Sequence, residues 1–128
     1  MPDKIWSMSS QKTILLVDDD LDLLENTAYM IRSMGCDVIT AENGQDAVLK
    51  YKEIEPDLTI MDIKMPIMDG FDAFFKMKQF DPKAKVVLIT AFSVDEKKHL
   101  KAKSMSLLST ISKPYSFEQL EEIVRKHV

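Results

Sequence analysis

Five polar side chains with a capacity for phosphoryl or metal chemistry each follow a short apolar run. They are Asp18, Asp19, Asp62, Thr90 and Lys113. A carboxylate can act as a nucleophile toward phosphorus and form an aspartyl phosphate. A divalent cation and a lysine ammonium can neutralise charge on the transferred phosphoryl oxygens, and a hydroxyl can donate a hydrogen bond to one of them. These residue types therefore favour phosphoryl transfer onto a carboxylate.

The three aspartates also predict a cation site. Asp18 and Asp19 follow the first apolar run, and Asp62 follows the third, whose strand is expected to neighbour the first. Two like charges about 4 Å apart repel by roughly 4 kcal/mol at an effective dielectric constant near 20. Protonation of one carboxyl group or a bound cation relieves this repulsion. Oxygen ligands with open coordination positions favour Mg²⁺, which binds carboxylates together with phosphate.

Alternating apolar runs and amphipathic segments position these residues. Short, mostly β-branched runs predict strands at residues 14–17, 38–39, 58–61, 86–89 and 111. Longer mixed segments predict helices over 21–34, 44–54, 69–80 and 94–105, and over the segment that Ser116 caps. Strict alternation predicts an α/β fold, a three-layer sandwich of a parallel sheet with helices on both faces. Ligands of such sheets bind beyond the carboxyl ends of the strands, where the polar residues lie.

Length and composition favour one soluble domain. The chain has 128 residues, of which 45% are hydrophobic and 30% are charged, as in ordinary globular domains. No apolar run approaches the roughly 20 residues of a membrane span, and the first residues lack the pattern of a secretion signal. We therefore expect a cytoplasmic protein without membrane contact, with a flexible extension over residues 1–12 and one domain over 13–128.

Charge and cysteine content exclude further classes. The net charge is −4, with no basic stripe along the chain, so nucleic acid is a poor partner. The single cysteine, Cys36, cannot form an internal disulfide, and with two histidines in the chain a zinc site is disfavoured.

Four motifs together resemble the receiver domains of two-component response regulators. They are Leu15–Asp20 (LLVDDD), Ile60–Gly70 (IMDIKMPIMDG), Ile89–Ala91 (ITA) and Ser112–Pro114 (SKP). Each motif alone is common, but all four in this order at the ends of strands one, three, four and five are specific. The match runs from about Lys12 to Val128. The resemblance implies a stand-alone receiver with a flavodoxin-like (βα)5 fold and the strand order 2-1-3-4-5.

The resemblance also implies a phosphoacceptor and a metal site. Asp62 resembles the phosphoacceptor, which receives its phosphoryl group from a phosphohistidine of a sensor histidine kinase or phosphotransfer protein. Asp19 resembles a direct Mg²⁺ ligand, and Asp18 a ligand that acts directly or through water. Asp62 and the backbone carbonyl of Lys64 complete the implied ligand set. Such a domain is not an enzyme in the ordinary sense, because it catalyses only its own phosphorylation and slow dephosphorylation.

The resemblance also implies roles for the remaining motif residues in a phosphorylation-induced conformational switch. Thr90 resembles the switch hydroxyl, and Lys113 resembles the phosphate-pairing lysine, with a cis peptide implied at Lys113-Pro114. Receiver domains usually carry Tyr or Phe three residues before this lysine, but this chain has Thr110. An aromatic rotamer switch therefore cannot operate there, and we expect signalling through the segment at Thr90 and the fourth helix instead.

The resemblance to receiver domains also implies binding partners and a slow loss of the phosphoryl group. We expect a downstream protein effector to bind the face of the fourth helix, fifth strand and fifth helix, and the chain to be a monomer or weak dimer. Lys64 and Phe92 flank the path of an attacking water in this fold, so they are expected to slow self-dephosphorylation. The alternative is a degenerate receiver that acts as a phosphorylation-independent interaction module, and the presence of all five site residues disfavours it.

Overall fold

The computed structural model describes residues 11–91 and 95–128 as a single parallel sheet with helices on both faces. The strands are β1 (Thr13–Val17), β2 (Asp37–Ala41), β3 (Leu58–Asp62), β4 (Val86–Thr90) and β5 (Ser109–Ser112). The helices are α2 (Leu21–Arg32), α3 (Gly44–Ile54), α4 (Gly70–Phe80), α5 (Glu96–Ser104) and α6 (Phe117–His127). The strand order is β2-β1-β3-β4-β5, so the predicted fold class and topology are confirmed.

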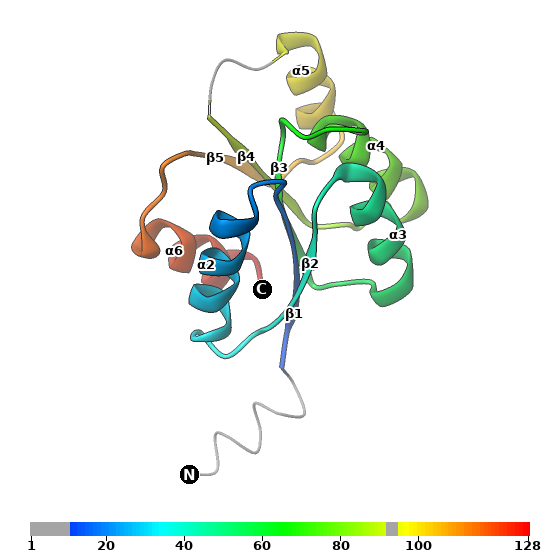
Figure 1. Ribbon diagram of the computed structural model, residues 1–128. Helices are drawn as coiled ribbons and strands as arrows, with labels where there is room; N and C mark the ends of the chain where they lie inside the picture. Colours follow the sequence, from blue (N-terminus) through cyan, green and yellow to red (C-terminus); the bar gives the residue numbers. More distant parts are fainter. Residues whose placement is uncertain (1–10, 92–94) are drawn as a thin grey trace.

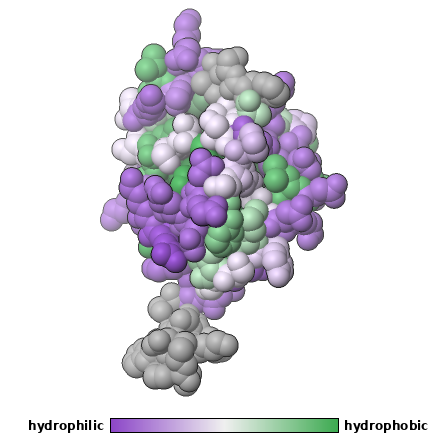
Figure 2. Space-filling model, turned by 90° about the vertical axis from the view of Figure 1, so that its left-hand side faces the viewer, coloured by the Kyte–Doolittle hydropathy of each residue, from purple (hydrophilic) through white to green (hydrophobic). Residues whose placement is uncertain are grey.

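Two hydrophobic cores hold the three layers together. Helices α2 and α6 cover one face of the sheet, and α3, α4 and α5 cover the other (Figure 1). Successive residues of β1 alternate between the two cores: Ile14 and Leu16 contact the first group of helices, and Leu15 and Val17 the second. Because both faces are covered, the central strands are continuously apolar, as predicted. The space-filling view of the α2 and α6 face shows small apolar areas separated by hydrophilic ones (Figure 2).

The ends of several elements differ from the sequence prediction. Helix α2 ends at Arg32 instead of Met34, since Gly35 adopts a positive φ of 94° that ends the helical path. Helix α5 begins at Glu96 because the Asp95 side chain caps it by accepting a hydrogen bond from the Lys98 amide. Its predicted first residue, Val94, lies outside the described residues. The predicted Ser116 cap is confirmed, and it forms a reciprocal capping box with Gln119.

The predicted N-terminal extension over residues 1–12 falls mostly outside the described residues. Its last two residues both contact Asp37 at the start of β2: Gln11 donates to the carboxylate, and the Lys12 carbonyl accepts from the backbone amide. No helix of the described ranges is long and apolar enough to cross a membrane.

The strand register aligns one edge of the sheet. Val17 pairs with Met61, Asp62 pairs with Ile89, and Thr90 pairs with Ser112. The residues that end these strands or follow them directly therefore lie side by side. This alignment brings together side chains that are up to 95 positions apart in the sequence, from Asp18 to Lys113.

Gly70, the first residue of α4, allows the helix to approach β3 closely. A Cβ atom at this position would collide with the backbone carbonyl of Asp62 and lie 2.8 Å from the Cα of Ile63. The Gly70 amide also donates a 2.7 Å hydrogen bond to the Ile63 carbonyl. Both obstacles are backbone atoms, so relief requires the strand end or the helix to move. Only a residue without a Cβ atom therefore fits at position 70 while α4 lies this close to the end of β3.

We expect Gly70→Ala to destabilise the domain by about 1–3 kcal/mol, the usual cost of overpacking a tight contact. Urea denaturation measures the change. Gln79→Ala, an exposed substitution on the same helix, is the matched control and should alter stability by less than about 0.5 kcal/mol. Equal stability of Gly70→Ala and wild type would refute the close approach.

Candidate functional site

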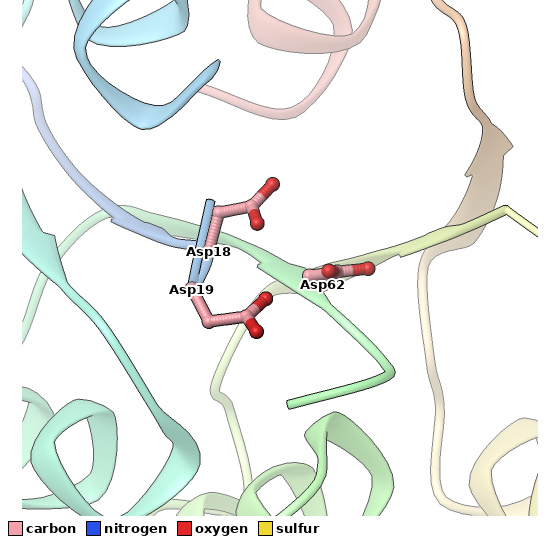
Figure 3. Close-up of side chains that lie close together, drawn as sticks. All are labelled: Asp18, Asp19 and Asp62. Carbon is pink, nitrogen blue, oxygen red and sulfur yellow. The ribbon is translucent and has the colours of Figure 1, made fainter. Parts of the chain in front are cut away.

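Three carboxylates converge at the aligned edge of the sheet. Asp18 and Asp19 follow β1, and Asp62 is the last residue of β3 (Figure 3). One carboxylate oxygen of each lies within 4.8 Å of the others. Asp18 and Asp62 are 2% and 5% exposed, whereas Asp19 is exposed to solvent. The predicted proximity of the three acids is therefore present, with two of them buried.

Lys113 supplies the opposing charge. Its ammonium lies 3.1 Å from Asp18 Oδ2 and 3.2 Å from Asp62 Oδ2, and it donates a hydrogen bond to the latter. Burial by itself lowers the pKa of Lys113, but the contacts with Asp18 and Asp62 outweigh it and raise the pKa above its ordinary value. The lysine is therefore held as a cation between the two buried carboxylates. The peptide bond that follows it, Lys113-Pro114, is cis, as the resemblance implied.

The surroundings of Asp62 raise the pKa of its carboxyl group. Burial and the charge of Asp18 raise its pKa from 3.8 to about 6, against the opposing effect of Lys113, and Asp19 raises it further. One lysine therefore compensates the acids only in part. At neutral pH Asp62 is still mostly ionised, as a nucleophilic carboxylate must be.

The donor set fits a magnesium ion. Asp18 Oδ1 accepts a 3.0 Å hydrogen bond from the Asp20 amide, but the buried Oδ2 accepts none within the described residues, although Lys113 lies near it. A buried carboxylate oxygen that has only a share of the Lys113 ammonium, beside two further carboxylates, is suited to a hard cation. The side chain of Asp20 does not join this donor set: it caps α2 by accepting a hydrogen bond from the Leu23 amide.

The other predicted site residues occupy the same edge or its surroundings. Thr90 ends β4 and is partly buried, and its carbonyl accepts a 2.8 Å hydrogen bond from the Lys113 amide. Lys64 lies exposed two residues beyond Asp62, and Thr110 is exposed on β5. Phe92, predicted to shield the phosphoryl group, lies outside the described residues.

Two contacts near the site were not predicted. Tyr115 and the buried Thr27 of α2 share a 2.8 Å hydrogen bond between their hydroxyls, which ties the segment after Lys113 to α2. Lys98 of α5 forms ion pairs with Asp69 and Asp72 at the start of α4, at 3.0 and 3.2 Å. No local pattern marks either contact, because the partners are 88, 29 and 26 positions apart.

The raised pKa of Asp62 predicts a pH dependence of stability in the presence of a chelator. Because the folded chain binds this proton more tightly than the unfolded chain, the Asp62 contribution to stability is fully present below about pH 4 and is lost as the pH rises through about 6. Replacing the charged group by asparagine should therefore stabilise the chelated protein progressively over this window, by up to about 2–3 kcal/mol at pH 7.

Urea denaturation of wild type and Asp62→Asn at pH 4 to 7 measures the difference. A difference that stays constant across this range would contradict the assignment of the raised pKa to Asp62. Mg²⁺ should reduce the difference at pH 7, because a cation at the cluster stabilises the ionised wild type preferentially.

Comparisons with known proteins agree in one family. Residues 14–125 match the family model of the response regulator receiver domain. The chemotaxis protein CheY of Halobacterium salinarum is 39% identical over 105 residues, which cover 81% of this chain and 86% of that protein. A response regulator receiver protein of Anaeromyxobacter is 32% identical over 109 residues, 85% of this chain but 45% of that longer protein.

A solved structure extends the similarity to three dimensions. The response regulator protein TrrA of Thermotoga maritima, in complex with Mg²⁺-BeF, aligns with a TM-score of 0.80 and 31% sequence identity. The alignment covers 92% of this chain and 100% of that chain.

Proposed function

Since this chain belongs to the response regulator receiver domain family, we propose that Asp62 accepts a phosphoryl group in a Mg²⁺-dependent reaction. The observation that carries the proposal is the position of Asp62: a buried carboxylate 3.2 Å from the Lys113 ammonium, with two further carboxylates within 4.8 Å. The proximity of Asp18, Asp19, Asp62 and Lys113 supports this proposal over a degenerate receiver.

In the proposed step, a carboxylate oxygen of Asp62 attacks the phosphorus of a phosphohistidine. The new O–P bond forms as the N–P bond breaks, and the imidazole nitrogen leaves with the electron pair. Lys113 stabilises negative charge on the phosphoryl oxygens, and the Thr90 hydroxyl donates a hydrogen bond to one of them. The carboxylates of Asp18, Asp19 and Asp62 and the Lys64 carbonyl would hold Mg²⁺, which when bound neutralises phosphoryl charge.

The donor is proposed to be a sensor histidine kinase or phosphotransfer protein of the cytoplasm. The effector is proposed to bind the face formed by α5, β5 and α6. A groove of about 440 Å³ supports this choice; it is lined by Thr110, Ile111 and Ser112 of β5 and by Gln119, Glu122 and Ile123 of α6. Thr110 stands at the position where receiver domains usually carry an aromatic switch residue, and it lines this groove. We also propose that Lys64 and Phe92 hinder the attacking water and so slow the loss of the phosphoryl group.

Incubation with acetyl phosphate tests the proposed function. Intact-mass measurement should find one added phosphoryl group per chain with Mg²⁺ and none with a chelator. No mass gain under either condition would contradict the phosphoacceptor role and favour an interaction module. Consumption of many donor molecules per chain within minutes would instead favour a phosphatase.

A further inference from the structure

A buried hydroxyl interrupts the apolar face of helix α2. The other buried residues of this helix are Leu24, Ala28 and Ile31. Thr27 lies among them and is 1% exposed, although a buried hydroxyl destabilises a fold unless it forms a hydrogen bond. Its partner is the hydroxyl of Tyr115, 2.8 Å away and 88 positions along the sequence. The two side chains form a matched polar pair in the apolar layer on the α2 and α6 face of the sheet (Figure 1).

The Tyr115 hydroxyl is also close to the charged cluster. Burial raises the pKa of Tyr115, and the charges of Asp18 and Asp62 raise it further. The hydrogen bond with Thr27 and the positive charge of Lys113 lower this pKa, but they do not cancel the rise. The phenol is therefore protonated at neutral pH and remains a hydrogen-bonding group. The hydroxyl pair lies within electrostatic reach of the groups to which the proposed chemistry is assigned.

The segment from Lys113 to Tyr115 is attached to β1 and α2 at both of its ends. At its first residue, the Lys113 ammonium lies 3.1 Å from Asp18 Oδ2, directly after β1. At its last residue, the Tyr115 hydroxyl meets Thr27 of α2. Pro114 lies between them, and its ring restricts the backbone. Contacts at both ends therefore limit how far the Lys113 side chain can shift along the edge of the sheet.

We propose that Thr27 and Tyr115 are positioning residues for Lys113, which hold its ammonium ready for the phosphoryl oxygens that arrive at Asp62. The inference rests on the proposed function, which gives Lys113 its part in phosphoryl transfer. A preorganised cation stabilises developing charge better than one that must be ordered during the reaction. Misplacing a reacting group by about 1 Å can slow a reaction about 100-fold, so loss of one tether outside the cluster should have a smaller effect.

Changes of a single side-chain atom test the proposal through the rate of phosphorylation by acetyl phosphate with Mg²⁺. Tyr115→Phe removes the phenol oxygen, and Thr27→Val replaces the hydroxyl by a methyl group. Each should slow phosphorylation about 5- to 10-fold. The double variant should be no slower than the slower single variant, because both changes remove the same hydrogen bond. Thr27→Ser keeps the hydroxyl and should retain the wild-type rate. Tyr29→Phe, which alters a 75% exposed tyrosine of the same helix, is the matched control and should also retain it.

A further variant asks whether the hydroxyl pair acts through Lys113. If it does, adding Tyr115→Phe to Lys113→Met should cause no further loss of rate, because the group that the pair positions is already absent. A further loss of about 5-fold or more in this background would overturn the proposal. Wild-type rates in both Tyr115→Phe and Thr27→Val would overturn it as well.

Hydrogen exchange separates a local loss of order from a general loss of stability. The Lys113 amide donates a 2.8 Å hydrogen bond to the Thr90 carbonyl. The Ile63 amide donates a 2.9 Å hydrogen bond to the Ile89 carbonyl at the same edge of the sheet. With a chelator present, Tyr115→Phe should speed exchange at Lys113 about 5-fold and leave exchange at Ile63 unchanged. Unchanged exchange at Lys113, or equal acceleration at both amides, would overturn the proposal.

The exchange measurement contains no phosphodonor, so it reports on the positioning of Lys113 whatever the outcome of the acetyl phosphate experiment. A wild-type protein that gains no phosphoryl group would refute the proposed function. Failure of the proposed function and failure of the positioning role are therefore observed separately.

Discussion

Replacing Asp62 by asparagine is expected to eliminate phosphorylation by acetyl phosphate while the fold persists. The amide keeps the shape of the side chain but has no nucleophilic oxygen that can form an aspartyl phosphate. Its neutrality also relieves the repulsion within the cluster, so no loss of folded protein should confound the result. Intact-mass spectrometry with Mg²⁺ measures the gain, and circular dichroism verifies the fold.

Asp22→Asn is the matched control, because Asp22 is an exposed acid in the first turn of α2, outside the cluster. This variant should gain one phosphoryl group as the wild type does. A phosphoryl gain in Asp62→Asn would refute the assignment, and peptide mapping would then identify the acceptor, with Asp19, the exposed carboxylate of the cluster, as a candidate.

Lys113→Met is expected to slow phosphorylation by about 100-fold or more, the usual consequence of removing one preorganised donor to developing oxyanion charge. Methionine preserves much of the apolar stem but removes the ammonium that lies 3.1 Å from Asp18 and 3.2 Å from Asp62. The rate constant follows from the time course of intact mass with acetyl phosphate and Mg²⁺. Lys83→Met, an exposed substitution away from the cluster, should leave the rate unchanged.

The same variant has a second readout, in the pH dependence of the rate. Lys113 lowers the pKa of Asp62, so its removal should raise this pKa further and move the acidic limb of the rate profile to higher pH. An unchanged rate and profile in Lys113→Met would show that the lysine has no part in the transfer.

The sequence alone predicted the architecture well, because its physical causes are local. A strand covered on both faces must be apolar at successive positions, and the runs around Leu15, Ile60 and Leu88 are. A helix start needs a cap, and the Ser116 cap was predicted from the residue type and the apolar spacing that follows it. The candidate site residues could be named because parallel strands place their carboxyl ends at one edge.

Only the tertiary structure decided how these side chains meet. Asp18 and Asp19 are adjacent and chemically identical, yet one is 2% exposed and the other lies in solvent. Burial and the nearby charges then raise the pKa of Asp62 to about 6, a value that no local pattern contains. The reach of Lys113 to two carboxylates likewise depends on the packing of β1, β3 and β5.

Helix α5 shows the same division most clearly. The sequence displays a lysine-rich segment in which Lys97 and Lys98 are neighbours. In the structure Lys98 turns inward to Asp69 and Asp72, whereas Lys97 faces solvent beside Leu100. Residue type and periodicity are properties of the chain and determined which residues can bury or carry charge. Which charges find a partner is a property of distance between elements, and the packing of α5 on α4 sets that distance.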